Sequence, residues 1–133
     1  MQRSGPFTVS VHLPTFVWDR PGAWDLVRDH HRYVVWKYED MHAARRRVAE
    51  PASPPPVTAQ EEALLRHSIV IGTPDEVALQ IDRYRRAAGG DLHFIARLYF
   101  PGLPWEVQRR TLRLFAEKVV PKVRDLAAEG PGD

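Results

Sequence analysis

The stretch Gly72-Thr-Pro-Asp-Glu-Val77 combines a turn glycine with a complete helix-start signal. Thr73 is a candidate N-cap, Pro74 takes the first helical position, and Glu76 stands three residues after Thr73 to close a capping box. A helix is therefore predicted to begin here and to end at the left-handed stop Gly89-Gly90. Its predicted buried stripe comprises Val77, Ile81, Tyr84 and Ala88.

Strands are predicted on both sides of this helix. Ser68-Ile-Val-Ile71 is too short for a long helix and suits a strand buried on both faces. The segment from His93 to Phe100 is the next predicted strand, ended by Pro101-Gly102. Residues 7–13 alternate apolar and polar with period two, and Pro14 is expected to end the regular hydrogen bonding of that strand. Its polar face carries Thr8, Ser10 and His12.

Three further helices are predicted from apolar residues spaced three and four apart. One runs from Ala23 to Ala44, a short one from Ala59 to Arg66, and the last opens at Pro104, where Pro121 is expected to bend or interrupt it. The long first helix is predicted to bury Trp24, Val27, His31, Val34, Tyr38 and Met41, and the last one Leu112, Phe115, Val119 and Leu126. Residues 50–58 are predicted as a proline-rich mobile loop and 129–133 as a disordered tail.

The predicted elements alternate along the chain as strand, helix, loop, strand, helix, strand and helix. Such alternation favours an α/β fold with a parallel sheet and right-handed crossovers. At 133 residues, the chain has the length of one domain. We therefore expect residues 1–133 to form a single domain of about three strand and helix units.

Composition excludes several classes of function. The chain has no cysteine, so disulfides, thiolate catalysis and cysteine-ligated metals are excluded. The formal net charge is +2 and the basic residues are interleaved with acidic ones, so no nucleic-acid partner is expected. No apolar run approaches a membrane span or a signal peptide, which predicts no membrane partner and a cytoplasmic location. His30 and His31 are adjacent on a helix rather than four apart, so no metal site is expected.

Four ordered motifs resemble the C-terminal region of the luciferase-like monooxygenase family, the flavin- or deazaflavin-dependent oxidoreductases built on an eight-stranded barrel. They are Gly72-Thr-Pro-Asp-Glu-Val77, Ile81 to Gly90, Leu92 to Gly102, and Leu114 to Pro121. Residues 7–41 resemble the preceding strand and helix of the family with lower specificity. The resemblance implies a partial TIM barrel that supplies about the last three of eight units. It also implies FMN or a deazaflavin as cofactor, although most of the flavin pocket of the family comes from earlier strands that this chain lacks.

Catalytic residues of a barrel lie at the C-terminal ends of its strands. Site residues are therefore expected among residues 12–18, at Gly72 and Thr73, and among residues 97–102. Gly72 and Thr73 are candidate cofactor-binding residues, because a helix N-terminus attracts a phosphate; the alternative is that Thr73 only caps its helix. Arg97 is a candidate catalytic residue, or the member of a structural ion pair with an acid such as Asp91. His12 is the other catalytic candidate, with a merely hydrogen-bonded histidine as the alternative. His31, on the apolar stripe of its helix, is predicted to be a hydrogen-bonded core histidine.

Two functions remain open from the sequence. The chain is a truncated or split luciferase-like flavin-dependent monooxygenase component, or it is a non-catalytic barrel remnant that acts as an oligomeric binding or structural module. A third interpretation is that the sequence is a piece of a longer protein. A three-stranded parallel sheet leaves edges and a face uncovered. We therefore expect a homodimer, with residues 23–44 in the contact, or a partner chain that supplies the missing strands.

Overall fold

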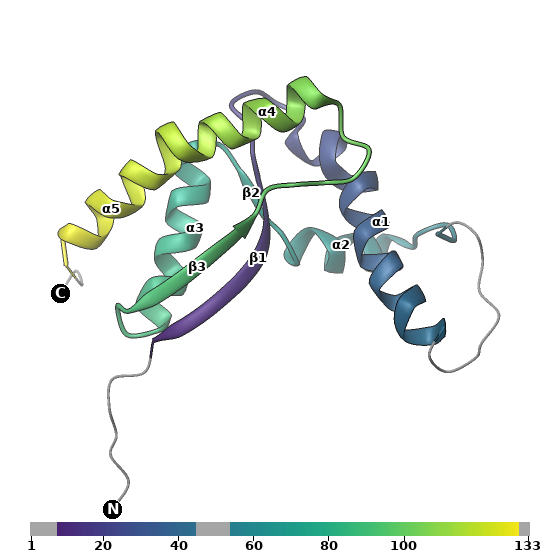
Figure 1. Ribbon diagram of the computed structural model, residues 1–133, viewed down its shortest axis with the longest axis horizontal. Helices are drawn as coiled ribbons and strands as arrows, with labels where there is room; N and C mark the ends of the chain where they lie inside the picture. The colour runs from purple at the N-terminus through teal and green to yellow at the C-terminus, as the bar shows by residue number, and fades with distance from the viewer. Residues whose placement is uncertain (1–7, 45–53, 131–133) are drawn as a thin grey trace, which may run out of the picture.

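The computed structural model describes residues 8–44 and 54–130, which form an α/β unit with one sheet (Figure 1). The predicted alternation of strands and helices is confirmed over these residues. The elements in chain order are β1 (Val9–Val17), α1 (Ala23–Ala44), α2 (Ala59–His67), β2 (Val70–Gly72), α3 (Pro74–Ala87), β3 (Leu92–Arg97), α4 (Trp105–Leu114), a π-helical turn (Phe115–Val119) and α5 (Val120–Ala128).

The sheet is parallel, as predicted, and its strand order is β2-β1-β3. The first part of β1, from Val9 to Pro14, pairs with β3, and the last part, from Thr15 to Val17, pairs with β2. Successive strands of a closed barrel are neighbours, whereas here the first strand lies between the second and the third. The described strands therefore form an open sheet with β1 at its centre.

Helices lie on both faces of this sheet (Figure 1). Right-handed crossovers explain this, since the steps from β1 to β2 and from β2 to β3 cross the sheet in opposite directions. One apolar cluster joins the end of β1 to α1 and contains Phe16, Trp18, Trp24, Val27, Ile69, Phe100 and Leu103. A second cluster lies against α3 and α5 and contains Val17, Val70, Val77, Ala78, Ile81 and Val119. The core is thus divided between the two faces by neighbouring residues of β1.

Two predicted strand ends were wrong. Pro14 does not end β1, which continues to Val17. Pro14 is the last residue paired with β3 and precedes the first residue paired with β2, so its missing N–H falls where the strand changes partner. The third strand ends at Arg97 instead of Phe100 because a side chain replaces the ladder there: Gln108 accepts from the N–H of Phe100 at 3.0 Å and donates to the carbonyl of Leu98.

The predicted stripe of α1 holds only for the first half of the helix. Trp24, Val27 and His31 are buried, whereas Tyr38 and Met41 are 56% and 52% exposed. The C-terminal half of α1 extends away from the sheet (Figure 1), so Tyr38 and Met41 do not reach its core. The predicted burial of Tyr84 and Leu112 is also wrong, since both side chains are exposed.

The predicted capping box at the start of α3 is confirmed, with Thr73 and Glu76 as its members. The short helix α2 begins at Ala59 as predicted, and the structure adds a second capping box there, formed by Thr58 and Glu61, which was not predicted from the sequence. Gly89 and Gly90 adopt the predicted left-handed conformation after α3, with φ of 82° and 100°. The interruption predicted near Pro121 takes the form of the π-helical turn, which directly precedes α5.

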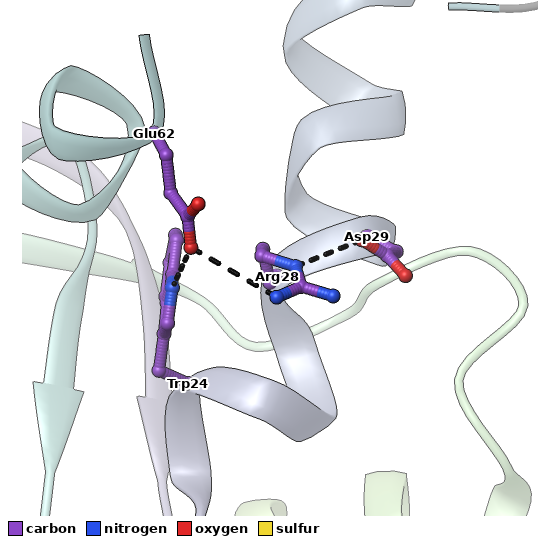
Figure 2. A network of polar contacts seen from close by, with 4 residues as sticks. All are labelled: Trp24, Arg28, Asp29 and Glu62. Atoms are coloured by element: carbon purple, nitrogen blue, oxygen red, sulfur yellow. Dashed lines mark hydrogen bonds and ion pairs between the residues drawn. The ribbon is translucent and has the colours of Figure 1, made fainter. Parts of the chain in front are cut away.

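Polar contacts attach α2 to α1 (Figure 2). The indole N–H of Trp24 donates to Glu62 Oε1 at 3.0 Å, and Arg28 Nη1 lies 3.9 Å from the same oxygen. Arg28 Nε also contacts Asp29 at 3.0 Å. Glu62 therefore joins a buried tryptophan of α1 to the short helix that leads into β2.

The remaining expectations concern the connecting segments. Residues 54–58 belong to no helix or strand, as expected for the proline-rich loop, while 50–53 lie outside the described residues. Helix α5 ends at Ala128, and positions 131–133 of the predicted tail are likewise outside the description, as is Phe7. Among the described helices, none is long and apolar enough to cross a membrane.

Candidate functional site

The two predicted catalytic candidates, His12 and Arg97, lie on one face of the β1 and β3 pair. Side chains of residues paired across parallel strands point to the same face. The register pairs Ser10 with His93, His12 with Ile95 and Pro14 with Arg97. We call this set the open face, because Ser10, His12, His93 and Ile95 are exposed in the part of the chain that the structure describes.

The opposite face of the same two strands is apolar and covered. It carries Leu13 and Phe94, which pack against the cluster of α3 and α5. Over residues 9–14, the alternation of β1 thus separates a helix-covered apolar side from a polar open side. Farther along, at Phe16, the same side as His12 is covered by α1. This division is confirmed as the sequence predicted it for the first strand, with Ser10 and His12 on the polar side.

At the N-terminal end of the open face, the polar groups satisfy one another. Thr8 Oγ1 donates to Asp91 Oδ2 at 2.9 Å, and Ser10 Oγ lies 3.5 Å from His93 Nδ1. These contacts join the starts of β1 and β3. Asp91, the acid suggested as a partner for Arg97, is therefore bonded to Thr8 instead.

Arg97 is half-buried and its Nε is a buried donor with no hydrogen-bond acceptor among the described residues. No ion pair of the described chain includes Arg97. The structural alternative for this residue, an ion pair with Asp91, is therefore wrong. Leaving a buried donor unsatisfied costs about 1–3 kcal/mol.

His31 lies near Arg97 in the core, 1% exposed, with its ring edge-on to Phe100. Its Nε2 is 2.8 Å from Ser68 Oγ, and the Ser68 hydroxyl donates to the Leu65 carbonyl at 2.7 Å. Since the serine proton is used there, Nε2 of the neutral ring must be the protonated nitrogen, and it donates to Ser68. The other nitrogen, Nδ1, is a buried acceptor without a partner.

The charge state of His31 follows from its surroundings. Burial, and then the positive charge of Arg97, lower the pKa of His31 from 6.5 to about 4. The ring is therefore neutral at neutral pH. The prediction of a hydrogen-bonded core histidine at this position is confirmed, although only one of its two nitrogens is bonded.

Gly72 and Thr73 lie at the C-terminal end of β2, where α3 begins. The Glu76 carboxylate accepts from the Thr73 N–H at 2.9 Å, and the Thr73 hydroxyl accepts from the Glu76 N–H at 3.3 Å. The same carboxylate would clash with a Cβ on Gly72. A phosphate at this helix start would meet that negative charge at close range, so these residues do not fit a flavin phosphate unless Glu76 moves away.

The C-terminal end of β1 leads to a hollow of about 600 Å³ beside Trp18, lined by Arg20, Arg110, Arg113 and Glu106 among others. Arg110 is held there by both carboxylate oxygens of Asp19, at 2.9 and 2.6 Å, and lies over the Trp18 ring at 5.6 Å. Its charge is already balanced by this pair. Arg110 is therefore not an unpaired cation in this hollow.

Sequence reasoning missed His93 and the relation between His31 and Arg97. The period-two pattern of the third strand places His93, Ile95 and Arg97 on one face, which was a usable signal for the former. The approach of His31 to Arg97 has no local signal, because it depends on how α1 crosses the sheet. Among the described residues, no group of three metal-ligating side chains comes together.

Comparison with known proteins adds no assignment: no family model matches the chain, and no curated protein matches it. The luciferase-like resemblance of residues 72–121 stays a prediction from the motifs.

Proposed function

We propose that this chain is a component of a luciferase-like flavin-dependent oxidoreductase that requires another polypeptide to complete its site. The motifs of residues 72–121 suggest the family. The exposed polar face of the β1 and β3 pair is the surface that the other polypeptide would cover under this proposal. In a barrel, helices cover the outside of the strands while the other face points to the interior. The proposal requires the part of the open face with His12 and Arg97 to point to such an interior, while the end of the same face at Phe16 is covered by α1.

Under this proposal, the other polypeptide supplies the earlier strands and most of the pocket for FMN or a deazaflavin. This chain contributes the polar side chains of the open face and the closing helices. The phosphate is bound by the partner, because Glu76 already occupies the start of α3 here. When bound, the flavin supplies the redox chemistry; the role of Arg97 and His12 is to bind and orient a polar group within the shared cavity.

Native mass spectrometry of the protein purified from its own host tests this proposal. The expected spectrum contains a larger partner or a retained flavin mass, and the purified assembly turns over with reduced flavin and oxygen. A spectrum with neither partner nor flavin, from an assembly that is inactive with reduced flavin, contradicts the enzyme role.

The alternative is a non-catalytic module that descends from the same barrel and binds through its open face as a homo-oligomer. One observation favours it: β1 lies between β2 and β3, with apolar clusters on both faces of its C-terminal part. A sheet with that order has an apolar core on each face of its central strand, whereas the strands of a barrel have helices on one face only. A homodimer without flavin in the same spectrum supports this alternative.

A further inference from the structure

We propose that Arg97 is the centre of an oxyanion-binding site on the open face, which accepts the carboxylate or phosphate group of a small molecule. The site is independent of flavin chemistry and exists under either function proposed above. Its components are Arg97 as the anion-binding residue, His12 as a neighbouring donor and Ile95 as an apolar contact.

Strand register brings these three residues together. Arg97 is paired with Pro14 and His12 with Ile95, so His12 stands diagonally across from Arg97 on the same face. Diagonal neighbours of a sheet remain within reach of long side chains. His12 and Ile95 are exposed and Arg97 is half-buried in the described part of the chain, whereas Arg97 Nε is shielded from solvent, so an oxyanion reaches it only when the side chains over it move aside.

The unsatisfied Nε of Arg97 is the observation that points to a ligand. A guanidinium presents Nε–H and Nη–H side by side, and this pair fits two oxygens of a carboxylate or phosphate. The nearby Nδ1 of His31 is an acceptor without a donor, and Arg97 Nε is a donor without an acceptor, so the two atoms are not bonded to each other. An oxyanion from outside the chain supplies the acceptor that Arg97 lacks.

Charge balance at this end of the open face also favours an anion. Asp91 is bonded to Thr8 at the opposite end of the strand pair. Burial and the Arg97 charge hold His31 neutral, so it brings no charge of its own to the guanidinium. The guanidinium charge is therefore available to a ligand, and its half-buried position reduces the competition from water.

Titration with inorganic phosphate and with acetate, each against sodium chloride at equal ionic strength, tests the site. The readouts are the Arg97 Nε–H resonance and the melting temperature of the full chain. We expect a saturable shift of that resonance and a rise in melting temperature with at least one of the two anions. A response to phosphate alone indicates a phosphate-bearing ligand, and a response to acetate alone indicates a carboxylate.

Arg97→Lys keeps the charge but removes the Nε–H, and we expect it to weaken anion binding about tenfold, or ~1.4 kcal/mol. The matched control is Arg109→Lys, an exposed arginine of α4, which should bind as the unmodified chain does. If Arg97→Lys fails to fold, His12→Gln at its exposed position serves as the second variant and should also weaken binding.

The proposal is overturned if neither anion gives a saturable response in the unmodified chain, which would mean that a water molecule satisfies Arg97. It is also overturned if Arg97→Lys, or His12→Gln in its place, binds as tightly as Arg109→Lys. A flavin-free homodimer that nevertheless binds phosphate at Arg97 would contradict the enzyme role and leave this site intact.

Discussion

At the scale of single residues, His31 gives the chain a pH-dependent stability. Its ring is neutral in the folded state, with a pKa lowered from 6.5 to about 4 by burial and by the charge of Arg97. Between these two values the unfolded chain binds a proton that the folded chain does not. The free energy of unfolding therefore rises with pH between about 4 and 6.5, and the stability that neutral His31 contributes is lost as the pH falls through this window.

We expect the free energy of unfolding to fall by roughly 2 kcal/mol from this residue between pH 7 and pH 5, since one pKa unit corresponds to ~1.4 kcal/mol. Urea denaturation at both pH values measures the loss. The His31→Gln variant cannot take up the proton and should show a smaller loss over the same interval. Equal losses in the two proteins would show that other groups cause the acid sensitivity.

At the scale of elements, α4 completes the sheet with side chains. Thr111 and Gln108 are buried polar residues on this helix. The Val17 N–H donates to Thr111 Oγ1 at 2.9 Å, and Gln108 bonds the backbone of Leu98 and Phe100. Both side chains act beyond Arg97, where β3 has ended and β1 continues without a neighbour on that side. The helix therefore satisfies backbone groups that a longer third strand would have paired.

Replacing the Thr111 hydroxyl tests this role. Thr111→Val preserves the shape of the side chain but leaves the buried Val17 N–H without an acceptor, and we expect a loss of about 1–3 kcal/mol in the free energy of unfolding. Thr111→Ser keeps the hydroxyl and is the matched control, which should retain most of the stability that the valine variant loses. Chemical denaturation of the three proteins measures both changes.

Elements that start at a strong local signal were predictable, because the residues that form the sequence motif are the same residues that bond each other in the structure. Thr73 and Glu76 lie three residues apart and bond each other directly, so the start of α3 follows from the sequence. The end of β3 was not predictable in the same way. Residues 98–100 are apolar and read as strand, but Gln108, eight residues beyond Phe100, takes their backbone bonds.

At the scale of the whole molecule, period-two alternation predicted which side of β1 is polar. It did not predict which helices pack on which face of the sheet. The strand order depends on where α1 and α3 pack, and an alternating pattern of elements is equally compatible with consecutive and with central placement of β1. The proximity of His31 and Arg97 belongs to this scale, because it joins α1 to the end of β3. Candidate residues were thus identifiable singly, while their grouping required the structure.

Association through the open face is testable with charge. Ile95 is 41% exposed on this face, and Leu79 is 47% exposed on α3. We expect Ile95→Lys to leave the isolated chain folded but to weaken the assembly at least tenfold, because the lysine would be buried in the contact. Leu79→Lys, the matched control, should preserve the assembly. Sedimentation velocity across a concentration series measures both, and equal affinities would place the contact elsewhere.

The two-partner strand β1 has a consequence for the order of folding. Its neighbours lie far along the chain: Val9 pairs with Leu92, and the Val17 N–H donates to Thr111 Oγ1. Contacts of such long sequence separation carry the loop-closure entropy that slows folding. During synthesis, β1 emerges before β3 and α4 and remains without these partners until they have followed, so its unpaired edge is exposed to aggregation over that interval.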